Sequence, residues 1–287
     1  MALQLRLGVT ATTGVAGDRT VTTDEALPCS QKKWKLTGLL RMPWLTPKCP
    51  VEAEDKVWIE ESMLWLIEEF GADTLRDVTV VLPTDEFFPD PFSEDEDDVQ
   101  ALVNRVCGYM GADPGRIELE FFTDQNRRLQ RSLPSFESSG SGVAGHYLKR
   151  RGKFVVSLES SQVSDPLFLV ATVAHELGHV RLVGEGRLHA GYDDHEFLTD
   201  LLTVFFGLGI FTGNSAFRFR QWAEGWQTER LGYMTEEMFG YALALFAWVR
   251  GESNPAWSSH LQGNVRAYFV SGHKYLEKTG DTQLSRL

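Results

Sequence analysis

The strongest constraint on the fold lies in residues 165–180, where a helix start signal, an apolar run and two histidines follow one another. Asp165 can cap the N-terminus of a helix, and Pro166 is favoured at the first helical position. Residues 167–173 then form an essentially unbroken apolar run. We therefore expect a buried helix here, and the rest of the chain must supply a core around it.

This helix carries the pattern H-E-x-x-H, with His175, Glu176 and His179 at the fixed positions. Residues four apart project from one helix face, so the two imidazoles can bind a single cation while Glu176 points toward a water bound to it. Histidines paired in a packed core would be the alternative. Gly178 is unfavourable in a helix, which predicts that another part of the chain closely approaches the backbone there.

A second apolar helix is expected from His195 to Phe206, after a polar stretch that follows Gly184. Glu196 and Asp200 are four apart and share one of its faces. A catalytic zinc ion needs a third protein ligand and an open fourth position. Glu196 is the preferred third ligand, His195 is a competing one, and Asp200 would orient a ligating histidine.

Residues 165–206 resemble the gluzincins, the thermolysin-like zinc metallopeptidases, in which H-E-x-x-H is followed on a later helix by E-x-x-x-D. The resemblance implies that His175, His179 and Glu196 bind zinc, that Glu176 is the general base, and that Asp200 supports a ligand. A metzincin would need glycine and histidine where this chain has Leu182 and Glu185. The pattern is also similar to a family of uncharacterised bacterial proteins that share His-Glu-Leu-Gly-His.

The predicted fold is α+β: a small mixed sheet, the zincin-type helix, and a helical C-terminal half. Strands are expected at 77–82, 117–121 and in a hairpin around Arg150-Arg151-Gly152, and helices at 54–70, 99–110, 235–249 and from Asn254-Pro255 toward Tyr275. Predicted domain boundaries are an N-terminal extension at 1–50, a metallopeptidase core at 51–212 and a helical subdomain at 213–287. The acidic run at 94–98 fits a helix start better than a calcium loop.

The charge and cysteine content of the chain argue against some classes of function. The 287-residue chain has a net charge of −12 and a single short basic cluster at 149–151, which argues against nucleic acid as a partner. Its three cysteines, Cys29, Cys49 and Cys107, contain no C-x-x-C pair, and neither a signal peptide nor a membrane span is expected. These features favour a cytoplasmic location.

Two functions remain open from the sequence. The first is a zinc-dependent hydrolase that cleaves peptide bonds in a peptide or protein substrate, and the second is a non-catalytic, zinc-stabilised regulatory or protein-binding module. Glu176 favours the hydrolase, because a purely structural zinc site does not need a base.

Overall fold

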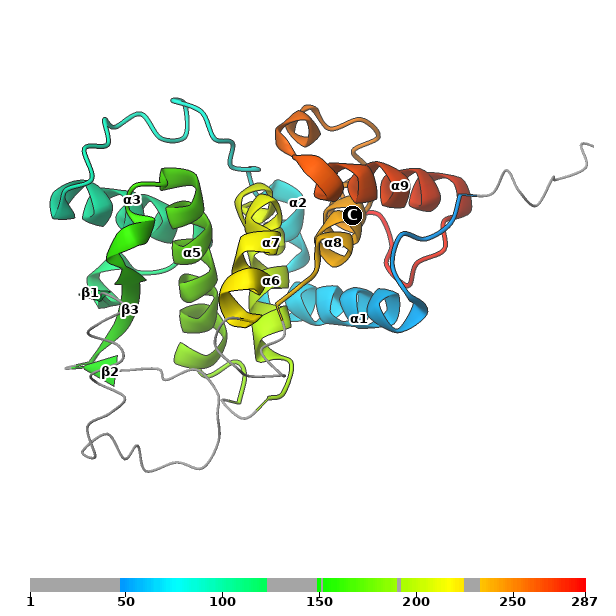
Figure 1. Cartoon of the computed structure of the whole chain (residues 1–287). Helices are drawn as coiled ribbons and strands as arrows, with labels where there is room; N and C mark the ends of the chain where they lie inside the picture. The colour runs from blue at the N-terminus through cyan, green and yellow to red at the C-terminus, as the bar shows by residue number, and fades with distance from the viewer. Residues whose placement is uncertain (1–46, 123–148, 151, 190–191, 225–232) are drawn as a thin grey trace, which may run out of the picture. The chain divides into compact units, whose positions relative to one another are not determined.

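The computed structural model of the chain describes residues 47–122, 149–150, 152–189, 192–224 and 233–287, and all of these belong to one compact unit (Figure 1). Residues 1–46 of the predicted N-terminal extension, with Cys29, and the part of the predicted hairpin before Lys149 lie outside the described residues. The helices are α1 (Ala53–Phe70), α2 (Ala72–Asp77), α3 (Glu96–Met110), α5 (Pro166–His179), α6 (His195–Phe205), α7 (Gly209–Glu224), α8 (Glu236–Val249) and α9 (Gly263–Thr279).

Helix α5 is the central element, as its sequence predicted. The Asp165 carboxylate accepts a hydrogen bond from the Phe168 backbone N–H at 3.2 Å, and Pro166 opens the first turn. Helix α5 contacts α3 and β3 as well as α6 and α7, so it lies between the sheet region and the other helices (Figure 1). A π-helical turn, Val180–Gly184, continues it to the predicted end at Gly184.

The sheet is small and mixed. Its order is β1 (Ile117–Phe122), β3 (Lys153–Glu159) and β2 (Lys149–Arg150), with β1 parallel and β2 antiparallel to β3. Phe154, Val156 and Leu158 are the buried residues of β3, and they alternate with more exposed ones. This period of two places one face of β3 against the core, where β3 contacts α5.

The strand predicted at 77–82 is wrong. Asp77 ends α2, and residues 78–82 are irregular. The Val81 N–H donates to the Gly207 carbonyl oxygen at 2.9 Å, and the Arg250 guanidinium binds the Val78 carbonyl oxygen at 2.7 Å. These backbone groups bond to the turn between α6 and α7 and to a side chain, so the segment packs on the core, with Val81 buried, without joining a sheet.

The predicted helices are present, with shifted starts. Helix α3 begins at Glu96 rather than residue 99, because Asp95 caps it by accepting from the Asp98 N–H at 2.9 Å. Asn254-Pro255 precedes a 3₁₀ helix, Ala256–His260, and α9 begins only at Gly263. The α+β class and the helical C-terminal half are confirmed.

One helical stretch of the described chain, Pro166–Gly184, is long and apolar enough to cross a membrane. However, 72% of its apolar window is buried inside the protein. The central helix of a globular core meets the same criteria, so the stretch gives little support for a membrane span.

Candidate metal centre

Helices α5 and α6 approach each other closely at Gly178. A β-carbon at this position would lie 2.7 Å from the Thr199 methyl group and 3.3 Å from the Thr199 carbonyl oxygen. The close approach predicted from the glycine is therefore present, and its partner is α6. It brings Glu196, one turn before Thr199, within reach of the histidines on α5.

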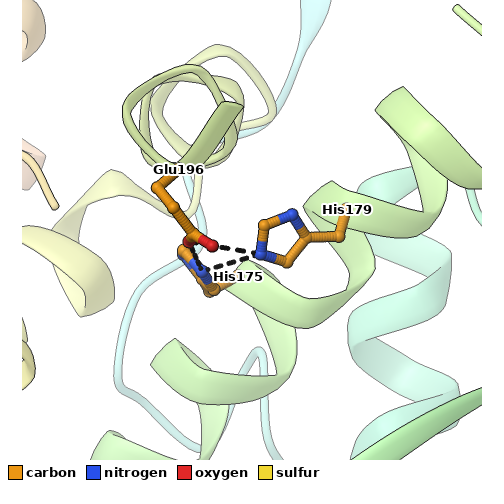
Figure 2. Close-up of side chains that lie close together, drawn as sticks. All are labelled: His175, His179 and Glu196. Carbon is orange, nitrogen blue, oxygen red and sulfur yellow. Dashed lines mark hydrogen bonds and ion pairs between the residues drawn. The ribbon is translucent and has the colours of Figure 1, made fainter. Parts of the chain in front are cut away.

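Three donor atoms converge between the two helices (Figure 2). The Glu196 Oε2 atom lies 3.0 Å from His175 Nε2 and 3.3 Å from His179 Nε2, and the two Nε2 atoms are 3.1 Å apart. All three side chains are buried. Among the residues that the structure describes, His175, His179 and Glu196 are the group that could hold a metal ion.

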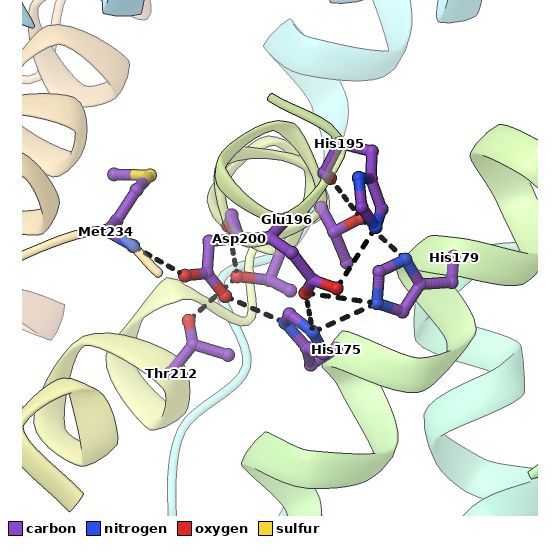
Figure 3. A network of polar contacts seen from close by, with 9 residues as sticks. His175, His179, His195, Glu196, Asp200, Thr212 and Met234 are labelled. Atoms are coloured by element: carbon purple, nitrogen blue, oxygen red, sulfur yellow. Dashed lines mark hydrogen bonds and ion pairs between the residues drawn. The ribbon is translucent and has the colours of Figure 1, made fainter. Parts of the chain in front are cut away.

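The protonation of His175 is fixed by Asp200, whose position is shown in Figure 3. Asp200 is 1% exposed, and its Oδ1 atom lies 2.8 Å from His175 Nδ1. A carboxylate accepts, so Nδ1 carries the proton and donates it. The second oxygen of Asp200 accepts from the Met234 backbone N–H at 2.9 Å, which fixes the carboxylate in turn. Asp200 therefore links His175 Nδ1 to the backbone at Met234.

The protonation of His179 is fixed by Thr199. The Thr199 hydroxyl donates to the His195 carbonyl oxygen at 2.7 Å, so toward His179 Nδ1, 3.1 Å away, it can only accept. His179 Nδ1 therefore carries a proton as well. In their neutral forms both histidines present an Nε2 lone pair to the same place, beside the Glu196 carboxylate.

A buried carboxylate that faces two imidazole nitrogens is stable only with a positive charge beside it. Burial lowers the pKa of His175, but its hydrogen bonds with Asp200 and Glu196 outweigh burial and hold that pKa well above its ordinary value. Burial raises the pKa of Glu196, but contacts with His175, His179 and His195 outweigh it and the pKa is strongly lowered. The site therefore favours a carboxylate with a proton or a metal cation between it and the imidazoles.

The spacing fits zinc. Two ligands of a tetrahedral zinc ion bound at about 2.0–2.1 Å lie about 3.3 Å apart. The three separations of 3.0, 3.1 and 3.3 Å are close to that value. Two neutral imidazoles and one carboxylate are also a donor set that suits zinc better than magnesium or calcium.

His195, the competing ligand, lies on the other side of Glu196. Its Nδ1–H donates to the Tyr192 carbonyl oxygen at 3.0 Å, while its Nε2 atom is 3.1 Å from Glu196 Oε1. That second contact lacks hydrogen-bond geometry, and Nε2 is a buried atom without a hydrogen-bond partner. Glu196 raises the pKa of His195, and burial opposes the change. His195 thus faces the oxygen of Glu196 that is turned away from the other two histidines.

Glu176 lies between the two histidines on α5 and is partly exposed, in contrast to its buried neighbours. A partly exposed carboxylate can exchange protons with solvent. The Tyr233 ring lies 5.3 Å from the His175 ring. His273 on α9 contacts the Glu252 carbonyl oxygen through its Nε2 atom at 2.8 Å and stacks on Phe269.

Sequence reasoning missed two groups of this site, Thr199 and the Met234 N–H. The position of Thr199 on the predicted helix, four residues after His195 and three after Glu196, was a usable signal. No spacing rule could have found Met234, which is 34 positions from Asp200.

Comparison with models of known families, with curated proteins and with solved structures finds no match to this chain.

Proposed function

We propose that this protein is a zinc-dependent metallopeptidase of the gluzincin type. One observation carries the proposal: Asp200 and Thr199 fix both histidines as Nδ1–H tautomers, so that both Nε2 atoms and Glu196 Oε2 converge at separations suited to zinc. His175, His179 and Glu196 would hold the ion. Three protein donors and one position for water or substrate are the composition of a catalytic rather than a structural site.

The proposed chemistry assigns the base to Glu176, which directly follows His175 on α5. Bound zinc would lower the pKa of a coordinated water from about 15.7 toward about 7 and polarise a carbonyl group. Glu176 would accept the proton of the attacking water and deliver it to the leaving amine nitrogen as the peptide bond breaks. Asp200 keeps His175 oriented and electron-rich throughout, and Thr199 does the same for His179.

The placement of Glu196 and Asp200 supports the gluzincin type in particular. Both come from one face of α6, which follows the H-E-x-x-H helix in the chain and packs against it. Glu196 meets both Nε2 atoms, and Asp200 meets the opposite nitrogen of His175. This is the division of roles that the E-x-x-x-D resemblance implies.

A second candidate function is a non-catalytic, zinc-stabilised protein-binding module. The buried Nε2 atom of His195 favours it, because this atom lacks a hydrogen-bond partner and lies beside Glu196. If His195 supplied a fourth donor, the site would be closed and zinc would stabilise the fold without exposing a reactive water.

The decisive experiment combines metal analysis with digestion of a peptide library. We expect one zinc per chain by native mass spectrometry and cleavage that stops on chelation. Glu176→Gln should retain zinc but lower turnover roughly 10²-fold or more, because the base is lost and the ligands remain. Glu61→Gln, an exposed site on α1, is the matched control and should behave as the wild type.

Three outcomes separate the alternatives. Full turnover in Glu176→Gln would exclude the proposed role of this carboxylate. Zinc binding without cleavage of any library peptide would favour the binding module, most clearly if His195→Ala also weakened zinc binding strongly. Absence of bound metal after zinc supplementation would exclude both functions.

A further inference from the structure

A pocket of about 240 Å³ lies at the opposite end of α5 from the metal centre. Its walls come from the irregular segment 83–92, from α3, from the first turn of α5 and from Phe211 of α7. None of the metal-binding residues lines it, and the nearest lining residue on α5, Val170, precedes His175 by five positions. This pocket has no part in the chemistry proposed above.

The pocket is held in shape by contacts on two sides. The Tyr109 hydroxyl of α3 donates to the Phe87 carbonyl oxygen at 2.7 Å, and Arg105 forms an ion pair with Asp90. The Phe88 ring packs edge to face on Phe211, with 5.6 Å between ring centroids. Segment 83–92 is thus tied to α3 and α7, so a ligand would meet a wall that is already formed.

The pocket has an apolar floor, and one apolar side chain is exposed at its mouth. Leu102, Val170 and Phe211 are buried beneath it, while Leu167 at the mouth is 49% exposed. Most sites for drug-sized ligands have volumes of about 300–1,000 Å³. At 240 Å³ this pocket has room for one or two apolar side chains and is small for a large cofactor.

The polar groups around the mouth are mainly acidic. Asp85, Asp90 and Asp98 line the pocket together with a single base, Arg105, which is already paired with Asp90. The buried Thr84 hydroxyl, also in the lining, has no hydrogen-bond partner. The pocket therefore combines an apolar floor, a negative rim and one unsatisfied hydroxyl that could bond to a peptide backbone group.

We propose that this pocket binds an apolar side chain of a peptide segment that carries lysine or arginine beside it. The apolar side chain enters between Leu102, Val170 and Phe211, and the adjacent base lies against the Asp85 side of the rim. The acidic rim disfavours an anionic membrane surface, and the small volume disfavours a bulky cofactor. The site is independent of the proposed catalytic activity.

Binding of labelled peptides, followed by fluorescence anisotropy, tests the proposal. The protein is the full chain with Glu176→Gln, so that bound peptides are not cleaved. The probes are short peptides with a central leucine or phenylalanine flanked by lysines, the same peptides with glutamates in place of the lysines, and the lysine peptides with a central serine. We expect only the first set to bind, with equal affinity in the presence and absence of chelator.

Two variant pairs locate the binding. Ala101→Trp fills the pocket from α3 and should weaken binding at least about tenfold, as loss of a central anchor does. Asn104→Trp, exposed on the same helix and outside the lining, should leave it unchanged. Asp85→Lys should weaken binding roughly three- to tenfold and reduce its salt dependence, whereas its neighbour Glu86→Lys should have a smaller effect.

The proposal is overturned if the lysine-flanked peptides do not bind or if they bind Ala101→Trp as well as the parent. It is also overturned if glutamate-flanked peptides bind equally, since the rim would then have no role. Preferential binding to anionic vesicles, reduced by Ala101→Trp, would assign the surface to a membrane instead. Circular dichroism and thermal unfolding of each variant show whether it is folded, so a folding failure is not mistaken for lost binding.

Discussion

Two buried glutamates, Glu60 on α1 and Glu196 on α6, have opposite kinds of surroundings. Glu60 is 0% exposed, and its Oε1 atom accepts from the Tyr241 hydroxyl at 2.6 Å and pairs with Lys56 at 3.1 Å. Its Oε2 atom accepts from the Gln283 backbone N–H at 3.0 Å. Glu196 instead contacts the imidazoles of His175, His179 and His195.

The difference lies in whether the partners carry permanent protons. A lysine ammonium, a tyrosine hydroxyl and a backbone N–H are donors at neutral pH, and burial together with Glu60 raises the pKa of Tyr241 further. The imidazoles around Glu196 have each committed one N–H to another acceptor. A buried carboxylate with complete, permanent donors is structural, whereas one surrounded by imidazole nitrogens can accommodate a metal ion.

The largest expected effect is on metal binding by Glu196→Ala. Structural zinc sites bind with about 10–16 kcal/mol over all their ligands, so loss of one charged ligand should weaken affinity roughly 10³-fold. Competition with a chromophoric chelator measures this. Glu60→Ala, purified in its folded form, should bind zinc as the wild type does. Equal losses of zinc affinity in both variants would contradict the assignment of Glu60 as structural and Glu196 as metal-binding.

The second-largest expected effect is a loss of unfolding free energy in Glu60→Ala. Glu60→Ala leaves the buried Tyr241 hydroxyl without its acceptor and removes one of the two carboxylates beside the partly exposed Lys56, which should cost about 1–3 kcal/mol of unfolding free energy. Urea unfolding of the metal-free protein gives the value. Glu61→Ala, next to it and exposed, is the matched control and should stay within about 0.5 kcal/mol of wild type. A small loss in Glu60→Ala would show that its hydrogen bonds contribute little.

A smaller effect is expected at Asp200. Asp200→Ala removes the acceptor that orients His175 and should lower zinc affinity about 10- to 100-fold while leaving the ligands in place. Asp200→Asn, which retains an acceptor oxygen, should recover part of the loss. If both variants bind zinc as the wild type does, the tautomer of His175 is set by other groups.

The smallest effect should come from His195. This side chain faces Glu196 Oε1 rather than the converging donors, so His195→Ala should weaken zinc binding less than about tenfold. The same chelator competition provides the measurement. A site that empties in His195→Ala but stays filled in Glu196→Ala would reverse the ligand assignment.

The site was predictable from sequence as far as its parts lie close together along the chain. His175 and His179, like Glu196 and Asp200, are four apart on one helix, and helix geometry alone places each pair on a single face. Gly178 predicted a close approach because a β-carbon is absent there. The identity of the approaching residue, Thr199, depends on how two helices pack, and local periodicity does not contain that information.

Prediction of secondary structure and strand pairing from the sequence fails where an element depends on contacts with residues far away in the chain. Residues 78–82 have strand composition, but their hydrogen bonds go to Gly207 and Arg250, and no sequence pattern specified those contacts. The parallel pairing of β1 with β3 has the same origin, since it joins strands separated by a long connection. Alternating apolar residues define a buried face but not the neighbour that covers it.

The two glutamates also differ in when their partners become available during synthesis of the chain. The contact between Glu60 and Gln283 spans 223 positions, and that with Tyr241 spans 181, whereas Glu196 meets His175 across 21. On a ribosome that adds about 5–20 residues per second, the second oxygen of Glu60 waits many seconds for its backbone donor. A nascent chain halted before residue 283 could already bring His175, His179 and Glu196 together, yet would keep Glu60 short of one hydrogen bond.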